Sequence, residues 1–258
     1  MRTADSSRIR VCIAGVTGWT GSAVAEAVRA AEDLELVAGV SRSDPDSYSS
    51  VAEALDTVRA DVLVDYTHAE AVKGNVDAAV ERDVNVVVGS SGLSAPDYDE
   101  IDARARERGV GVVSAGNFSI TAAVLLRAAT DAARHLEAWE IVDFASAGKP
   151  DAPSGTAREL AERLEEVRRP TIGLPVDDIV GPREARGAEV AGSRVHSLRL
   201  PSFVVSTEIV FAADGERLSI RHDAGESPAP YVAGTLLAIR SVVGRTGLTR
   251  GLDRLLAD

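Results

Sequence analysis

The sequence of 258 residues predicts an α/β fold in which a doubly wound parallel sheet is joined to a smaller α+β domain with an open mixed sheet. Three observations favour this class. Short β-rich runs alternate with helical patterns through the first half, as βαβ units do. Only 4% of the residues are aromatic although 45% are hydrophobic, which suits a parallel sheet covered by helices. After residues 117–119 this alternation stops.

The first half predicts five strands and four helices. Each predicted strand is a short run rich in valine or other apolar residues, and each ends in a loop of small or polar residues, where doubly wound folds bind their ligands. The predicted strands are 10–14, 34–40, 62–66, 85–88 and 111–114, and the predicted helices lie near 21–31, 51–58, 69–82 and 96–108.

The second half predicts a different order of elements. A long helix runs to about residue 133, a strand covers 138–145, a helix follows at 157–166, and three strands lie near 194–200, 203–213 and 216–223. A stretch interrupted by glycine and proline, at 170–193, separates the helix at 157–166 from the three strands. A helical pattern at 231–243 returns to the first domain. We therefore place one domain at 1–118 with 229–258, and the other at 119–228.

Composition excludes several classes of function. The net charge of −12 argues against a nucleic-acid partner, whose phosphates require a basic surface. The single cysteine, Cys12, rules out an internal disulfide and a multi-cysteine metal site, so we expect no metal. No apolar run approaches the roughly twenty residues of a membrane span, and residues 1–10 have no apolar signal region. We expect a cytoplasmic protein without a membrane partner.

A glycine-rich loop follows the first predicted strand and opens the first predicted helix. Its sequence is Gly15-Val-Thr-Gly18-Trp-Thr-Gly21, with Gly-x-x-Gly-x-x-Gly spacing in place of Gly-x-Gly-x-x-Gly. We expect Gly15 and Gly18 to let the backbone approach a pyrophosphate, and Gly21 to let the helix lie close to the sheet. The loop, in its strand–loop–helix context, predicts a Rossmann-like dinucleotide site.

The second predicted strand ends in Val40-Ser41-Arg42, where an NAD-preferring protein usually carries an acid for the ribose 2′-hydroxyl. Ser41 cannot repel a 2′-phosphate, and the Arg42 guanidinium can pair with one. The residues therefore favour NADP(H). The alternative is an arginine exposed on a loop with no ligand.

The segment Lys149-Pro-Asp-Ala-Pro-Ser-Gly-Thr156 precedes the helix predicted at 157–166. Lys149 is one of two lysines, the other being Lys73, and every other basic residue is arginine. An ammonium group at this position indicates a need for a compact cation that can give up a proton. Together with Ser154, Gly155 and Thr156 at a helix N-terminus, it predicts a carboxylate site. The alternative is an ordinary capped helix after a tight turn.

Three further motifs follow the third, fourth and fifth predicted strands. They are Asp65-Tyr-Thr67, Gly89-Ser-Ser-Gly92 and Gly116-Asn-Phe-Ser119. With the glycine loop and the Lys149 segment, they resemble the 4-hydroxy-tetrahydrodipicolinate reductase (dihydrodipicolinate reductase) family of lysine biosynthesis over essentially the whole chain. The Asp-Ala-Pro-Ser-Gly-Thr run is specific to this family, whereas the glycine loop alone is not.

The resemblance implies a dinucleotide-binding domain at 1–118 with 229–258, and a substrate-binding and oligomerisation domain at 119–228. It also implies a homotetramer that reduces a cyclic unsaturated imine dicarboxylate with NADPH, NADH being possible. Lys149, Gly155 and Thr156 would hold the substrate, and Lys149 would also supply a proton. The implied cofactor residues are Gly15, Val16, Thr17, Gly18, Trp19, Thr20, Ser41, Arg42, Gly89, Ser90, Ser91, Ala115, Gly116, Asn117 and Phe118.

One departure from the family concerns the general acid. Family members carry a His-His pair four and three residues before this lysine, and this chain has Ala145 and Ser146 there. Among its four histidines, His68 lies nearest to the predicted ligand edge and is the candidate substitute. The others are interpreted as structural residues; they are His135, His196 and His222.

Two other functions stay open on the sequence alone. An NADP-dependent amino-acid dehydrogenase or imine reductase with another substrate would share the scaffold, and a non-catalytic NADP(H)-binding sensor would share the cofactor loop. Semialdehyde reductases with a cysteine nucleophile have a similar loop, but Cys12 lies on a predicted buried strand and cannot be that nucleophile.

Overall fold

The computed structural model describes residues 8–256, which divide into two compact units. The first contains the residues up to Ser119 and those from Pro228 onward, and the second spans Ile120–Ser227. The predicted boundaries at 118/119 and 228/229 differ from these by one residue. Among residues 8–256, no helix is both long and apolar enough to cross a membrane.

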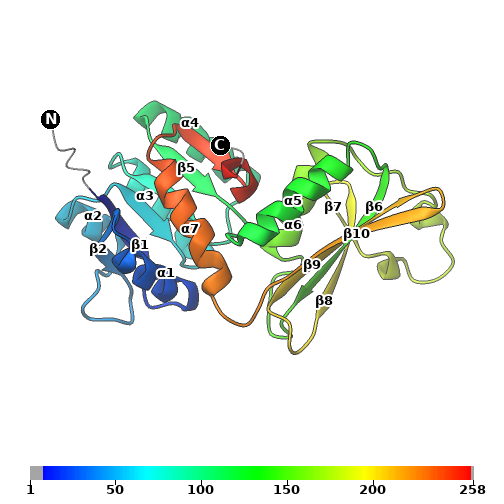
Figure 1. Cartoon of the computed structure of the whole chain (residues 1–258), viewed down its shortest axis with the longest axis horizontal. Coiled ribbons are helices and arrows are strands. Elements are labelled where there is room, and N and C mark those ends of the chain that lie inside the picture. The colour runs from blue at the N-terminus through cyan, green and yellow to red at the C-terminus, as the bar shows by residue number, and fades with distance from the viewer. Residues whose placement is uncertain (1–7, 257–258) are drawn as a thin grey trace. The chain divides into compact units, whose positions relative to one another are not determined.

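The first unit contains a parallel sheet of six strands in the order β11-β5-β4-β3-β1-β2 (Figure 1). Its strands are β1 (Ile9–Ala14), β2 (Leu34–Val40), β3 (Val62–Asp65), β4 (Asn85–Val88), β5 (Gly111–Ser114) and β11 (Gly247–Arg250). The predicted parallel sheet is confirmed, with bounds within one residue for all five predicted strands. The sequence analysis missed β11, a four-residue strand that pairs with β5 at the edge of the sheet.

Helices cover both faces of this sheet. They are α1 (Trp19–Ala30), α2 (Val51–Thr57), α3 (Ala69–Val80), α4 (Ala95–Arg108) and α7 (Ala229–Val242), followed by the 3₁₀ turn η3 (Leu252–Leu255). Helices α2, α3 and α4 pack side by side, and α1 packs with α7. The central strands β3, β4 and β5 are buried on both faces, which explains their nearly continuous valine runs.

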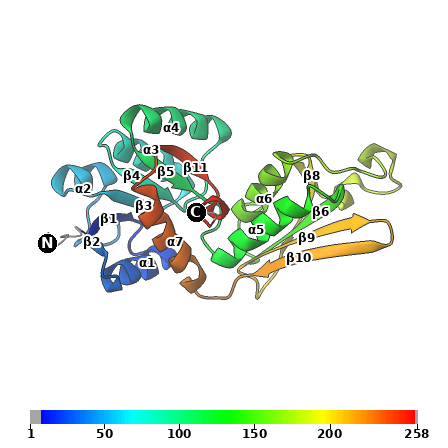
Figure 2. The ribbon, with the colours of Figure 1, turned by 45° about the horizontal axis from the view of Figure 1, so that its top comes forward.

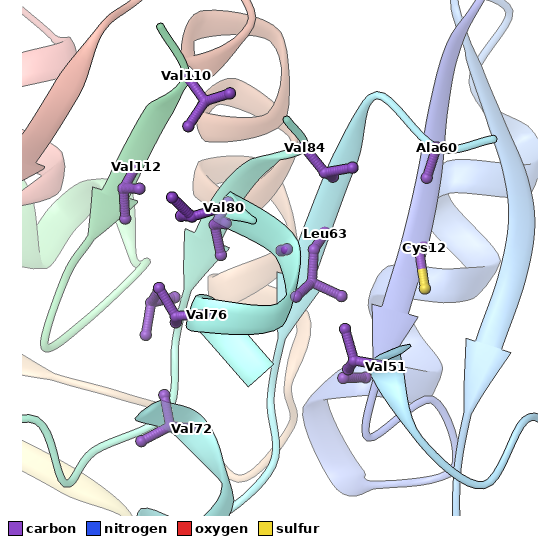
Figure 3. Close-up of a cluster of buried hydrophobic side chains, with 14 of the residues drawn as sticks. Cys12, Val51, Ala60, Leu63, Val72, Val76, Val80, Val84, Val110 and Val112 are labelled. Atoms are coloured by element: carbon purple, nitrogen blue, oxygen red, sulfur yellow. The ribbon is translucent and has the colours of Figure 1, made fainter. Parts of the chain in front are cut away.

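The core beneath α2 and α3 is built mostly from valine and alanine (Figure 3). Cys12 lies within it and is fully buried. Burial raises the pKa of the Cys12 thiol to about 12, so the thiol stays protonated at neutral pH. This agrees with the exclusion of Cys12 as a nucleophile.

The second unit contains a mixed sheet of five strands in the order β10-β9-β6-β8-β7. Its strands are β6 (Ala138–Ala145), β7 (Ala188–Val190), β8 (Ser193–Arg199), β9 (Val205–Ala213) and β10 (Glu216–Asp223). Strand β6 pairs in parallel with β8 and antiparallel with β9. The predicted open mixed sheet is therefore confirmed, and the short strand β7 is an addition to it.

Two helices, α5 (Ile120–Ala132) and α6 (Gly155–Glu165), lie along one face of this sheet (Figure 2). Inward-facing residues of β6, β8 and β9 pack against them, among them Trp139, Ile141 and Phe211. The connection from α6 to β7 contains two 3₁₀ turns, η1 (Val176–Asp178) and η2 (Arg183–Arg186). On the opposite face, the segment at 170–186 lies against β6, β8 and β9.

Candidate functional site

The glycine loop of the first unit is shaped by close contacts between backbone segments. Gly15 has a φ of +81°, and a Cβ there would lie 2.3 Å from the carbonyl oxygen of Tyr66. A Cβ on Gly21 would lie 2.0 Å from the carbonyl oxygen of Gly15. Helix α1 therefore sits directly on the loop, as expected for Gly21, and Gly15 serves the turn beside β3.

The N-terminus of α1 has the character of an anion site. Gly18 is its N-cap and has no side chain to accept from the first-turn N–H groups, and α1 carries no acidic residue in that turn. Helix N-terminal N–H groups without a capping side chain, together with the helix dipole, favour a phosphate group. Trp19, the first residue of the helix, is 52% exposed.

A cluster of hydroxyl groups lies where β1 and β2 end. The hydroxyl oxygens of Thr17 and Ser41 are 2.8 Å apart, and those of Ser41 and Ser43 are 3.1 Å apart. The Arg42 side chain is exposed between Ser41 and Ser43 in the chain. Three hydroxyls and a guanidinium group are donors that suit a phosphate dianion.

Histidine 68, the candidate substitute acid, belongs to this part of the first unit. It precedes α3, its Nε2 atom lies 2.9 Å from the guanidinium of Arg42, and its Nδ1 atom lies 2.8 Å from the carboxylate of Glu70. Both ring nitrogens are thus engaged by neighbours in the dinucleotide-binding unit.

The motifs after β3 and β4 are joined by a buried carboxylate. Asp65 is fully buried and accepts hydrogen bonds from Thr67, Asn75 and Ser90. The Ser90 hydroxyl is thereby turned toward the protein, whereas Ser91 is exposed. This network holds the loops after β3 and β4 together at the carboxyl edge of the sheet.

The segment after β5 is held by α7. A Cβ on Gly234 would lie 1.9 Å from the carbonyl oxygen of Phe118, so α7 packs directly on that backbone. Asn117 accepts a hydrogen bond from the Ser119 N–H at 2.8 Å. The predicted cofactor residues after β1, β2, β4 and β5 are therefore brought to one edge of one sheet, where doubly wound folds bind nucleotides.

In the second unit, the Lys149 segment connects β6 to α6. The Lys149 ammonium lies 2.8 Å from the Asp151 carboxylate and is 29% exposed. The other lysine, Lys73, pairs with Asp77 and Glu100 on helices of the first unit. Lys149 is thus held by one carboxylate of its own loop.

Ser154, predicted to belong to the carboxylate site, is the N-cap of α6. Its side chain is 1% exposed, and its N–H and hydroxyl both donate to the Asp143 carboxylate, at 2.9 and 2.6 Å. The same hydroxyl oxygen accepts from the Ala157 N–H as the N-cap of α6. These bonds fix the Ser154 side chain and shape the loop. Gly155 and Thr156 form the first turn of α6.

Asp143 organises this loop from the inner face of β6. It is fully buried and also accepts from Ser197 at 3.1 Å and from Arg199 at 2.9 Å. Arg199 donates in addition to the carbonyl oxygen of Asp151 at 2.6 Å. One buried ion pair therefore ties β6, β8 and the Lys149 loop together.

The sequence analysis named neither Asp143 nor Arg199 as site residues. Asp143 did carry a signal, because it occupies an inward position of an alternating strand, two residues from Ile141. Arg199 carried none, since its place beside Asp143 depends on the pairing of β6 with β8.

Positions 145 and 146 end β6 in the same unit. Ala145 is fully buried and Ser146 is exposed, with its carbonyl accepting from the Lys149 N–H at 3.0 Å. Of the other histidines, His196 lies 2.7 Å from Glu140 on the adjacent strand. Burial lowers the pKa of His222, so this imidazole is neutral at physiological pH.

The first unit has a sheet edge of the kind that binds nucleotides, and the second has a loop with a lysine that suits a carboxylate. Together they define the class of NAD(P)H-dependent oxidoreductases. Family comparison agrees: the models "Dihydrodipicolinate reductase, N-terminus" and "Dihydrodipicolinate reductase, C-terminus" match residues 9–118 and 121–256. The chain belongs to the dihydrodipicolinate reductase family. It catalyses a reduction in lysine and diaminopimelate biosynthesis.

Individual relatives cover nearly the whole chain. It is 40% identical to the 4-hydroxy-tetrahydrodipicolinate reductase of Nocardia farcinica over 96% of this chain and 98% of the relative. It is 39% identical to the enzyme of that name from Cutibacterium acnes, with the same coverage. A dipicolinate-bound dihydrodipicolinate reductase from Paenisporosarcina sp. TG-14 superposes with a TM-score of 0.78 at 27% identity, covering 96% and 99% of the two chains.

An amine dehydrogenase from Mycobacterium smegmatis shares the fold, with a TM-score of 0.62 at 15% identity and 96% coverage of both chains. This likeness concerns the fold alone. The comparisons therefore do not favour the amino-acid dehydrogenase or the sensor that the sequence left open.

Proposed function

We propose that the chain reduces 4-hydroxy-tetrahydrodipicolinate to tetrahydrodipicolinate with NADPH, and that Lys149, Gly155 and Thr156 hold the substrate. The observation that carries this proposal is the loop in which Asp151 holds the Lys149 ammonium and Asp143 fixes the N-terminus of α6. Both features attract a carboxylate. The relative from Paenisporosarcina was solved with the dicarboxylate dipicolinate, which supports an anionic ring as the ligand.

The first unit fits the cofactor. Its residues would hold the pyrophosphate at the α1 N-terminus, whose first turn carries no acidic side chain. They would hold the 2′-phosphate at Ser41 and Arg42, since a serine does not repel a phosphate and the guanidinium pairs with it. We assign the rest of the dinucleotide to the loops after β4 and β5, at Gly89–Ser91 and 115–118. When bound, NADPH supplies the hydride.

Lys149 has two tasks in this proposal. Its ammonium neutralises a substrate carboxylate. In doing so, Lys149 gives up its ion pair with Asp151 and forms a charge-assisted hydrogen bond to the substrate. It also carries the proton that the substrate takes up, because an ammonium group gives up a proton far more readily than a guanidinium. No histidine stands at 145 or 146 to share that second task.

The direct test is consumption of NADPH with the condensation product of pyruvate and aspartate semialdehyde as substrate. We expect turnover that depends on both compounds. Absence of turnover with a folded, NADPH-binding protein would contradict the proposed reaction and leave the fold assignment untouched. A cytoplasmic location is part of the proposal, and a buried free thiol with NADPH as reductant fits it.

Cofactor choice is expected to depend on Arg42. Arg42→Glu should weaken NADPH binding by about 1.5–3 kcal/mol, roughly 10- to 150-fold, and spare NADH, since a charge-assisted bond to the 2′-phosphate is lost. Dissociation constants for both cofactors measure this. Arg29→Glu, at an exposed arginine in the last turn of α1, is the matched control for net charge. Equal losses for NADPH and NADH would contradict the assignment.

We also propose a homotetramer assembled through the second unit. The sheet face opposite α5 and α6 contains a groove of about 620 Å³ between β6, β8, β9 and the segment at 170–186. Its lining is mostly apolar, with Val142 and Val210 at the sheet, and it also contains the charged or polar side chains Glu140, Arg186, Arg194 and His196. The same segment exposes Leu174, at 56%. An apolar face of this kind on a sheet favours association of subunits.

Light scattering tests this assembly. The wild-type protein is expected at the mass of four chains, and Val210→Glu at a lower mass, since it places a charge in the apolar groove. Val124→Glu, at a valine of α5 that is 54% exposed, is the control and should remain tetrameric. A monomeric wild-type protein at working concentration would refute the proposal.

A further inference from the structure

The imidazole of His68 connects two charged side chains at the predicted 2′-phosphate site. Its Nε2 atom lies 2.9 Å from Arg42, and its Nδ1 atom lies 2.8 Å from Glu70. Arg42 follows β2 and His68 follows β3, and these two strands flank β1 in the sheet. The contact therefore links the loops on either side of the strand that leads into the glycine loop.

The partners of His68 determine its tautomer. A guanidinium can only donate hydrogen bonds, so Nε2 must accept from Arg42. Hydrogen bonds from the backbone N–H of Glu70 and from the His68 side chain lower the pKa of the Glu70 carboxyl. This carboxylate is therefore ionised and accepts from the Nδ1–H of His68. The arrangement requires a neutral imidazole with its proton on Nδ1, and Glu70 is the group that selects this form.

The contact restricts a side chain that would otherwise be mobile. Arg42 is exposed, and a free arginine loses rotamer freedom when it binds a ligand. A hydrogen bond to Nε2 reduces that loss by holding the guanidinium before a phosphate arrives. Two acidic residues lie on the loop after β2: Asp44 is already bonded to the Ser47 hydroxyl at 2.6 Å, and Asp46 is exposed.

We propose that His68 is a positioning residue, which acts through Arg42 to raise the preference of the enzyme for NADPH over NADH. The inference rests on the proposed pairing of Arg42 with the 2′-phosphate. It replaces the hypothesis that His68 is the general acid, and it adds a residue to the cofactor site that the glycine and arginine motifs do not contain.

The quantity to measure is the ratio of the dissociation constants of NADH and NADPH, by titration calorimetry. Ordering one side chain is worth about 0.5–1.5 kcal/mol, so His68→Ala should lower this ratio roughly 2- to 10-fold while the NADH constant stays unchanged. His68→Gln should recover part of the loss, because its amide oxygen can accept from Arg42. His135→Ala, at an exposed histidine of the second unit, is the control.

A double-mutant cycle with Arg42→Ala completes the test. If His68 acts through Arg42, the double variant should have the same ratio as Arg42→Ala alone. A further loss in the double variant would overturn the positioning role and indicate direct contact of His68 with the phosphate.

Two results separate this inference from the function on which it rests. An unchanged ratio in His68→Ala, with a lowered ratio in Arg42→Ala, would overturn the inference and leave the proposed cofactor site standing. An unchanged ratio in Arg42→Ala would overturn both. A fall in kcat for His68→Ala, with an unchanged ratio of the two dissociation constants, would restore the hypothesis that His68 is the general acid. It would refute the positioning role.

Discussion

Lys149→Met is expected to reduce kcat/KM by several orders of magnitude while NADPH affinity and the fold stay nearly intact. Loss of a general acid alone lowers turnover roughly 10²- to 10⁴-fold, and loss of the ammonium removes a charge-assisted bond to the substrate carboxylate as well. Within residues 8–256, the side chain forms an ion pair with Asp151 of its own loop, so its removal leaves the core of the second unit unchanged. Steady-state kinetics with NADPH titration measures both quantities.

Lys149→Arg separates the two tasks of this residue. A guanidinium keeps the positive charge but gives up its proton far less readily. We therefore expect this variant to recover KM more than kcat.

Lys73→Met is the matched control, since Lys73 also forms ion pairs but lies on α3 of the first unit. If Lys149→Met has kinetics close to those of the wild type, the proposed mechanism is refuted. Lys149 would then be a surface lysine before a turn, with no role in the reaction.

Asp143→Ala is expected to lower the free energy of unfolding of the second unit by about 3–5 kcal/mol. The carboxylate is fully buried and bonds to Ser154, Ser197 and Arg199. Its removal leaves the Arg199 charge, which is 16% exposed, without its anion. It also leaves three donors, the N–H and hydroxyl of Ser154 and the hydroxyl of Ser197, without this acceptor. Urea unfolding followed by the fluorescence of Trp139 reports on this unit.

The control for Asp143 is a second Asp–Arg pair of the chain. Asp56 bonds to Arg82 but is 65% exposed, so Asp56→Ala should cost at most about 1 kcal/mol. Equal costs for the two variants would contradict the view that the buried pair holds the Lys149 loop in shape.

Much of the first unit was predictable because its information is local. Each strand of a parallel sheet is buried on both faces and must be a short apolar run, as at Val86–Val88 of β4 and Val112–Val113 of β5. Turn and helix-start residues such as Gly15 and Gly18 also act on their immediate neighbours. The glycine loop, the end of β2 and the Lys149 segment were therefore visible as motifs.

The strands missed by the sequence analysis lack such a local pattern. The edge strand β11 is Gly-Leu-Thr-Arg, four residues without a buried run, and it becomes a strand because α7 returns the chain to β5. Asp102 of α4 then accepts the Leu248 N–H at 2.7 Å. Strand β7 has three residues and forms by pairing with β8.

The sequence by itself determined the fold class and the family, and it predicted the residues of two ligand loops. Only the tertiary structure decided what those side chains touch. Ser154 is taken up by Asp143, 11 residues away, and Arg199 reaches the same carboxylate from 56 residues away. His68 meets Arg42 across 26 residues. Propensity and spacing describe a chain over a few residues, whereas these partners are set by strand register and sheet order, which exist only after packing.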